Sequence, residues 1–178
     1  GSIVVSNIEG EVKTRTSGGS LKFNSVKGNL IGKTSGGSIK LKDCSGDVSV
    51  GTSGGSINIG TVSGTVKAHT SGGSIRVTEV MGKIDASTSG GSVKAYISKQ
   101  PKADCYLKTS GGSINVKLDA KLRFNLDART SGGTVSTDFP VKVSGKLRRN
   151  KLQSAINGGG PELVLKSSGG SIRISKID

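Results

Sequence analysis

The chain has 178 residues, a length typical of one domain. Only 31% of its residues are apolar and 3% are aromatic, while 29 are glycine, so a core of bulky side chains is excluded and small side chains must fill the interior. Its 26 basic and 12 acidic residues give a net charge of +14, which bears on partners and solubility rather than on fold. This charge fits acidic glycans, lipopolysaccharide, teichoic acids or nucleic acid as partners. It equally fits a solvated exterior on which Lys protects strand edges.

A five-residue motif, Thr-Ser-Gly-Gly-Ser at 16–20, recurs along the whole chain. The later copies are separated by steps of 18, 18, 18, 18, 21, 21 and 37 residues, and they begin at Thr34, Thr52, Thr70, Thr88, Thr109, Thr130 and Ser167. A fixed period of this size predicts a repeat architecture. An array of hairpins would need Asn-Gly or Asp-Gly turns recurring at short spacing, which the sequence lacks. The regular Val, Ile and Leu positions argue against a disordered Gly/Ser-rich chain.

Apolar residues alternate on both sides of each motif. Val48 and Val50 precede the third copy, for example, and Ile57 and Ile59 follow it. Alternation with period two predicts strands, so each unit is expected to hold two or three short strands separated by sharp corners. We expect the motif Thr to point inward and its hydroxyl to bond a backbone group of the corner.

The paired glycines of the motif are expected to form the corner. The step from the inward Thr to the next inward apolar residue is five positions, an odd number. The glycines are therefore predicted to adopt positive φ and reset the alternation. These corner glycines are Gly18, Gly19, Gly36, Gly37, Gly54, Gly55, Gly72, Gly73, Gly90, Gly91, Gly111, Gly112, Gly132, Gly133, Gly169 and Gly170.

One unit buries almost nothing alone, so the units must stack. The sequence predicts an all-β fold, a single-stranded parallel β-helix or β-solenoid with about 18 residues per rung and about nine rungs. Parallel crossovers are overwhelmingly right-handed, and we predict a right-handed coil. We expect one domain over 1–178, with regular rungs at 3–97 and irregular, loop-bearing rungs at 98–178.

The irregular part departs from the 18-residue period at three places. Pro101 cannot donate to a strand ladder, so a loop or bulge is expected there, and 121–123 is expected to form a second extra turn. Residues 139–143 are predicted to form a strand. The segment 157–160, Asn-Gly-Gly-Gly, is expected to return the chain to the last unit. The 37-residue step then corresponds to one hidden rung plus a full one.

Two basic features are candidate binding sites. The densest is a turn whose cations could hold an anionic group, and its candidate residues are Lys142, Lys146, Arg148, Arg149 and Lys151. The other lies one residue after the first apolar position that follows each motif. Stacked rungs would align these residues into a stripe able to follow an extended polyanion: Lys22, Lys40, Asn58, Arg76, Lys94, Asn115 and Arg173. Solvated surfaces explain both features equally well.

Other chemistry-bearing residues point to no catalytic or metal site. Cys44 and Cys105 fall on inward positions two to three rungs apart, beyond disulfide reach, and are expected to be buried free thiols. His69 is alone and outward-facing, and the carboxylates are scattered, so we predict no cofactor, no metal site and no enzyme activity. The glycine pairs lack the Gly-Lys-Ser/Thr ending of a phosphate loop. No segment is long and apolar enough to cross a membrane.

The Ser-Gly-Gly-Ser-Ile repeats and the Ile-Asn-Gly-Gly-Gly-Pro turn at 156–161 resemble the bacterial adhesin-like β-repeat family. Its members are domains of unknown function in cell-envelope proteins. The resemblance covers essentially the whole chain and implies an exported or surface-associated β-helix. It offers no catalytic residues. Gly1 resembles the single residue that tag cleavage leaves behind, and a strand-like segment follows it directly. We therefore expect any export signal to have been removed.

These observations favour a non-catalytic cell-envelope or extracellular β-helix, adhesin-like, that binds an anionic polymer, a glycan or a protein partner. One alternative is a structural solenoid that assembles end to end through its open rungs, like a bactofilin. A less favoured alternative is a polysaccharide-processing enzyme, which would need paired carboxylates in a groove. The sequence carries no specific nucleic-acid motif.

Overall fold

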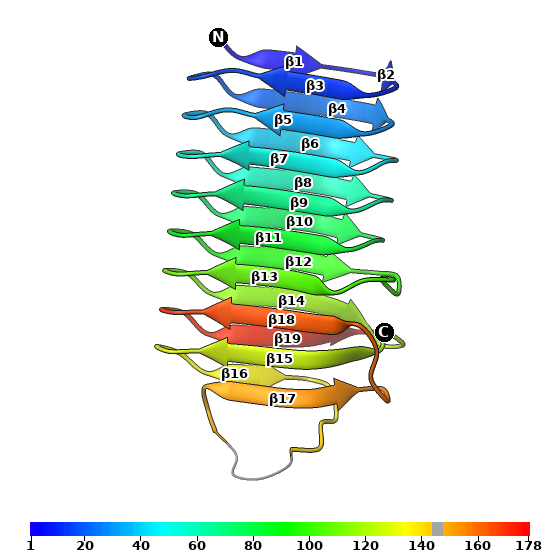
Figure 1. Cartoon of the computed structure of the whole chain (residues 1–178), viewed down its shortest axis with the longest axis vertical. Helices are drawn as coiled ribbons and strands as arrows, with labels where there is room; N and C mark the ends of the chain where they lie inside the picture. The colour runs from blue at the N-terminus through cyan, green and yellow to red at the C-terminus, as the bar shows by residue number, and fades with distance from the viewer. Residues whose placement is uncertain (144–147) are drawn as a thin grey trace.

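The computed structural model describes residues 1–143 and 148–178, which form two β-sheets lying face to face (Figure 1). Sheet A has ten strands in the spatial order β1-β4-β6-β8-β10-β12-β14-β19-β16, with β2 also paired to β4. Its strands are β1 (Ile3–Val5), β2 (Ile8–Glu9), β4 (Leu21–Lys27), β6 (Ile39–Cys44), β8 (Ile57–Val62), β10 (Ile75–Val80), β12 (Val93–Ile97), β14 (Ile114–Asp119), β16 (Val135–Thr137) and β19 (Ile172–Ile177).

Sheet B has nine strands in the order β17-β15-β18-β13-β11-β9-β7-β5-β3. These are β3 (Val12–Arg15), β5 (Leu30–Lys33), β7 (Val48–Thr52), β9 (Val66–Thr70), β11 (Ile84–Thr88), β13 (Cys105–Thr109), β15 (Phe124–Thr130), β17 (Lys151–Ile156) and β18 (Glu162–Ser167). From β3 to β14 the chain alternates between the sheets and completes six successive turns. The predicted parallel β-solenoid with a repeat near 18 residues is therefore confirmed.

The core is a thin layer between the two sheets. Alternate side chains of each strand point inward and stack on their equivalents in the next turn, as Ile39 and Ile57 do with 0% of their surface exposed. The layer is narrow, and the large ring of Phe23 fits because Gly32 lies opposite it. A Cβ at Gly32 would stand 3.3 Å from that ring. The core is otherwise built mainly of Leu, Ile and Val side chains, so the expected interior of small side chains is found only at positions such as Gly32, Ala68 and Ala86.

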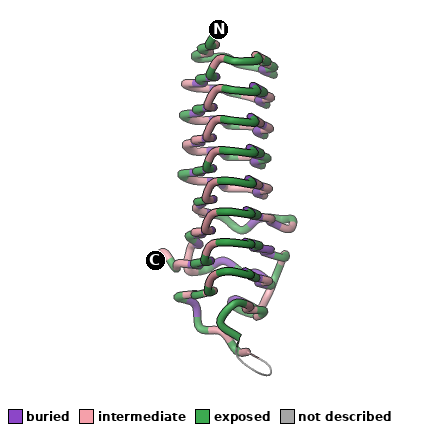
Figure 2. The backbone as a smooth tube through the Cα atoms, turned by 90° about the vertical axis from the view of Figure 1, so that its left-hand side faces the viewer, coloured by how far each residue is buried: buried purple, intermediate pink, exposed green. Residues whose placement is uncertain are grey.

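The repeated motif forms the corner between the sheets, and its copies stack along one side of the molecule (Figure 2). The motif Thr is buried in the copies from Thr34 to Thr130, and its hydroxyl donates to the carbonyl of the second Gly in the adjacent layer. Thr16 of the first copy is half-buried and donates to Gly1 O. Thr34 Oγ1 reaches Gly19 O at 2.7 Å, and Thr88 Oγ1 reaches Gly73 O at 2.6 Å. The predicted inward Thr and its backbone partner are confirmed.

The reason for the motif glycines differs from our prediction. None of them has positive φ, so the predicted left-handed conformation is wrong. Their restriction is steric, because a Cβ on the second Gly of a motif would overlap the backbone of the motif stacked against it. At Gly73 this Cβ would overlap the Gly55 carbonyl. The first Gly has more room, and at Gly18 a Cβ would meet nothing within 4 Å.

The C-terminal third does not continue the coil in chain order. Strand β18 lies between β13 and β15, and β19 lies between β14 and β16, so the last motif-bearing segment is inserted into the stack (Figure 1). The motif contacts agree with this order. Ser167 Oγ donates to Gly112 O at 2.8 Å, and Thr130 Oγ1 donates to Gly170 O at 2.6 Å. The prediction of about nine successive rungs is therefore wrong after the sixth turn.

An antiparallel strand makes the insertion possible. β17 pairs with β15 in the antiparallel direction, so the chain returns toward the solenoid instead of adding another turn. The return uses Asn157, Gly158 and Gly159, which all have positive φ, and the Asn157 amide donates to the carbonyls of Ala120 and Leu122. The predicted return at 157–160 is confirmed, whereas the hidden rung is wrong.

The segment between β16 and β17 holds one further correction. Residues 139–143 do not form the predicted strand, because Phe139 instead buries its ring in the core (4% exposed). The predicted loops at 98–104 and 120–123 are present, and Gln100 connects them through hydrogen bonds to the backbone of Arg123. The handedness of the coil stays a prediction.

Candidate anion-binding surfaces

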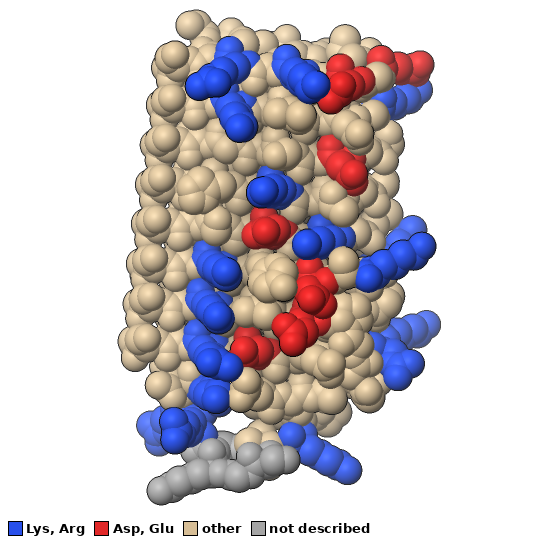
Figure 3. Space-filling view, viewed as in Figure 1, with Lys and Arg blue, Asp and Glu red and all other residues tan. Residues whose placement is uncertain are grey.

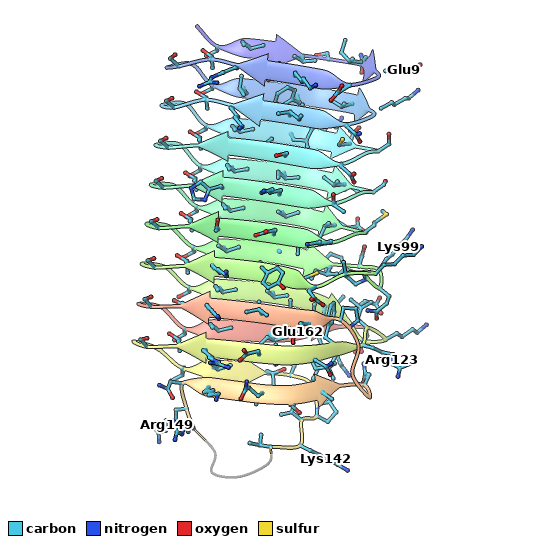
Figure 4. The ribbon with its side chains drawn as sticks, viewed as in Figure 1. Glu9, Lys99, Arg123, Lys142, Arg149 and Glu162 are labelled. Carbon is cyan, nitrogen blue, oxygen red and sulfur yellow. The ribbon has the colours of Figure 1, made fainter. Side chains whose placement is uncertain are left out.

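The structure does not bring the residues of the predicted basic turn together. Lys142 and Arg149 project from opposite sides of the end of the molecule (Figure 4). Arg148 and Lys151 face each other across a single bridge at the start of β17. Lys146 lies outside the described residues. Among the described candidates, Lys142 and Arg149 thus do not converge, and an anion site at this turn stays a prediction.

The predicted stripe does form, and we call these seven residues the basic stripe. Direct strand pairing places its members side by side in successive layers of sheet A, and they are Lys22, Lys40, Asn58, Arg76, Lys94, Asn115 and Arg173. Neighbouring strands lie about 4.8 Å apart, so the stripe spans roughly 29 Å. Because β19 is the inserted strand, Arg173 directly follows Asn115 in this row.

A shallow groove runs beside the basic stripe. Its largest section has a volume of about 560 Å³ and includes Arg76, Lys94, Tyr96, Lys117 and Arg173. Two further sections share Arg76 with it and extend the groove toward the N-terminal turns. None of the described residues that line these three sections is Asp or Glu.

Ion pairs leave most of this charge uncompensated. In the described part of the chain, Arg173 is the one member of the basic stripe with a carboxylate partner, and its Nη2 lies 3.7 Å from Asp138 Oδ1. Exposed pairs at this distance contribute little binding energy. The groove therefore presents lysine and arginine to solvent without a matching anion.

Sheet B has a mixed surface in which carboxylates lie among the basic residues (Figure 3). Asp85 and Asp127 occupy the same outward row as Lys13 and Lys67. At the N-terminal end a groove contains Arg15, Lys33, Lys67 and His69, and His69 Nδ1 lies 2.8 Å from Ser87 Oγ. The charges of this sheet are thus more nearly balanced than those of the groove on sheet A.

One row of sheet B is an exception that sequence reasoning missed. Four cations lie in adjacent layers near the corner, where Figure 3 shows a vertical row of basic residues over β13, β18, β15 and β17. We call them the junction row: Lys108, Lys166, Arg129 and Lys151. Lys108, Arg129 and Lys166 each directly precede a motif copy, so the repeat register aligns them in one outward row. The insertion of β18 places Lys166 between the other two, and the antiparallel β17 adds Lys151.

The family assignment follows from the whole repeat. Residues 3–175, which contain both sheets and all eight motif copies, match the family described as Toastrack DUF4097. This chain belongs to the Toastrack DUF4097 family. The adhesin-like β-repeat resemblance is thereby confirmed, and the function of the family is unknown. No characterised protein and no solved structure matched the chain.

The two thiols of this Toastrack domain are structural. Cys44 and Cys105 are buried and free, as predicted, and burial raises the pKa of both thiols above its ordinary value. Buried neutral thiols of this kind are inert compared with exposed thiolates. Within residues 1–143 and 148–178, no three His, Cys, Asp or Glu side chains form a cluster suited to a metal ion. These described ranges also contain no helix that could cross a membrane.

Proposed function

We propose that this Toastrack domain is a non-catalytic, envelope-associated or extracellular module that binds an acidic polysaccharide along the basic stripe. The observation that carries the proposal is the groove on sheet A, in which lysine and arginine recur over successive layers without a lining carboxylate. An extended polymer can contact such a repeated row at many points, each of them weak. The sum of these contacts provides avidity.

The neutral groups of the groove favour a sugar polymer. Tyr96 lies half-buried beside Lys94 and Lys117, and an aromatic ring in a polar groove offers a stacking surface for a sugar ring. Asn58 and Asn115 interrupt the cations of the basic stripe, and their amides can bond hydroxyl groups. Single-stranded nucleic acid is favoured less, because its binding sites use several aromatic rings for successive bases. The three described sections of the groove contain one aromatic ring besides the buried Phe23.

The experiment compares binding to acidic and neutral envelope polysaccharides at about 50 and about 300 mM salt, because salt strongly screens a purely electrostatic contact over that range. The test variant is Arg76→Gln/Lys94→Gln/Lys117→Gln. Its matched control, Lys67→Gln/Lys99→Gln/Lys102→Gln, removes the same charge from exposed positions elsewhere. We expect saturable binding to one acidic polymer that persists at the higher salt. The affinity should fall about tenfold in the test variant and less than about twofold in the control.

Two results would contradict this proposal. Equal loss of affinity in both variants would make binding a general consequence of the +14 charge. Binding of every polyanion, abolished at the higher salt, would lead to the same conclusion. Release of shorter saccharides during incubation would instead support the alternative of a polysaccharide-processing enzyme.

End-to-end assembly remains the alternative structural role. The unpaired edges of β1 and β3 could pair with another strand, but the opposite end of sheet B carries β17, whose antiparallel direction interrupts a continuous parallel stack. We therefore expect a monomer. Sedimentation velocity over a 100-fold range of protein concentration would reveal filaments, if they form, as a growing sedimentation coefficient.

A further inference from the structure

The junction row, Lys108, Lys166, Arg129 and Lys151, places four cations side by side in adjacent layers of sheet B. Direct pairing joins Lys108 to Lys166, Lys166 to Arg129, and Arg129 to Lys151. At about 4.8 Å per layer the row spans roughly 14 Å. Lys108, Lys166 and Arg129 are exposed and Lys151 is half-buried, so the row is open to a ligand along its length.

Strand packing does not explain this run of like charges. The N-terminal part of the same outward row is Arg15, Lys33, Gly51, His69 and Ser87, in which neutral residues follow the first two cations. Like charges directly opposite on neighbouring strands are destabilising. Among the described residues the junction row has one carboxylate partner, since Arg129 Nε lies 2.7 Å from Asp127 Oδ1. A bound polyanion would offset the remaining repulsion between these cations by attracting each of them.

We propose that the junction row is a binding site for a linear phosphate polyanion, and that its occupation holds the inserted rung, β18 and β19, in the stack. The site is separate from the basic stripe, which lies on the other sheet. A ligand on all four cations would connect β13, β18, β15 and β17, the strands whose order results from the insertion. By linkage, a ligand that binds only this order stabilises it.

The chemistry of the row favours phosphate over a sugar acid. Three of the four cations are lysines, which bind phosphate as point charges, and one phosphate has enough oxygens to accept from cations of adjacent layers. The nearby Tyr106 ring is already contacted by ammonium groups, with Lys83 Nζ at 5.8 Å and Lys108 Nζ at 5.6 Å from its centre. The exposed corner serines Ser110, Ser131 and Ser168 follow the row closely in the sequence and add hydroxyl donors.

The experiment uses the full chain and inorganic tripolyphosphate as the probe. Binding is measured by calorimetry, and hydrogen–deuterium exchange follows the amides of β18 and β19. We expect saturable binding, and we expect the probe to slow amide exchange more in β18 and β19 than in β7 and β8. Tm should rise by about 5–10 °C when the probe exceeds its Kd 100-fold. Single phosphate should bind far more weakly because it carries less charge and contacts fewer of the four cations.

The variant Lys108→Gln/Lys166→Gln separates this proposal from a general charge effect. Removing the repulsion should raise Tm without ligand by about 2–4 °C, while the affinity for tripolyphosphate falls about fivefold or more. The control Arg15→Gln/Lys33→Gln removes the same charge from the other end of the same outward row and should leave this affinity nearly unchanged. Polysaccharide binding by the basic stripe should be unchanged in both variants, so each site can fail independently.

Three outcomes would overturn the proposal. The first is no binding of tripolyphosphate at 1 mM, a concentration about 1,000-fold above a micromolar Kd. The second is equal loss of affinity in the two variants. The third is binding without slower exchange in β18 and β19, which would remove the connection to the inserted rung. Tighter binding of a short acidic oligosaccharide of equal charge would show that the phosphate assignment is wrong.

Discussion

The first six turns and the C-terminal third use the same corner motif, yet their strands are joined in different orders. From β4 to β12 each strand pairs with the strands one turn before and one turn after it in the chain. In the last third, β18 and β19 pair with strands on either side that precede both of them. The comparison teaches that a corner specifies how two layers fit together but not which two layers meet, because every copy offers the same surfaces.

Removal of the inserted rung should have the largest effect. Deleting residues 157–178 removes the buried Leu163, Leu165, Ile172 and Ile174, and it leaves β13 and β14 each unpaired on one edge. Each of these side chains contributes about 1.5–3 kcal/mol through burial, so the third containing β15–β17 should unfold. Limited proteolysis should cleave within 120–156 and spare 3–97. Continued resistance at 120–156 would show that the rung is dispensable.

Filling a motif glycine should have the next largest effect. Gly73→Ala places a Cβ against the Gly55 backbone and should lower the free energy of unfolding by about 1–3 kcal/mol or more. Gly18→Ala, where a Cβ meets nothing within 4 Å, is the control and should be close to neutral. Gly133→Ala, which contacts the inserted Gly170, tests whether the last third has the same tolerance. Urea denaturation measures all three, and equal stability of Gly73→Ala and Gly18→Ala would contradict the steric argument.

Loss of one corner hydroxyl should have a smaller effect. Thr70→Val removes the hydroxyl Oγ1, which donates to Gly55 O at 2.8 Å, and should lower the free energy of unfolding by about 1 kcal/mol. Ser167→Ala removes the equivalent bond to Gly112 in the inserted rung. We expect similar losses for the two variants by thermal unfolding. A much larger loss for Ser167→Ala would mean that the insertion depends on this single bond.

The buried thiols should give the smallest effect, and only at high pH. Because burial raises the pKa of Cys105 in the folded state, the unfolded chain loses its thiol proton first as pH rises. This contribution to stability is fully present below the unfolded thiol pKa, near 8.5, and is lost as pH rises through the folded pKa. Cys105→Ala should therefore show a weaker decline in Tm between about pH 8.5 and 10 than the parent chain. An identical decline in Tm with pH for the two chains would contradict a raised pKa for Cys105.

Much of the regular part could be predicted from the sequence, because one period repeats there. The alternation around each motif placed Val48, Ile57 and their equivalents inward, and the basic stripe followed from the same register. The insertion could not be predicted in this way. Val135 and Ile172 occupy equivalent places after their motifs, so either could pair with the β14 layer. Alternation also does not encode strand direction, so it predicts a hidden rung where the structure has the antiparallel β17.

The candidate sites divide in the same manner. The basic stripe depends on one residue per period and can be predicted from the sequence, whereas the order of the junction row and its fourth member, Lys151, depend on the inserted β18 and the antiparallel β17. The predicted basic turn shows the same limit at two of its described residues. Density of charge along the chain does not determine convergence in space, and Lys142 and Arg149 point apart (Figure 4). The 37-residue step between the last two motifs is the one signal in the sequence of a change in layer order.

The inserted rung also imposes an order of events during protein synthesis. β15, β16 and β17 leave the ribosome before the strands that will separate them from the six completed turns. At roughly 5–20 residues per second, the ribosome needs a few seconds more to make β18 and β19. During that interval the edges of β13 and β14 are open, and β15 and β16 can occupy the wrong layer. The first six turns can fold as they are made, whereas the last third must wait for its interior layer.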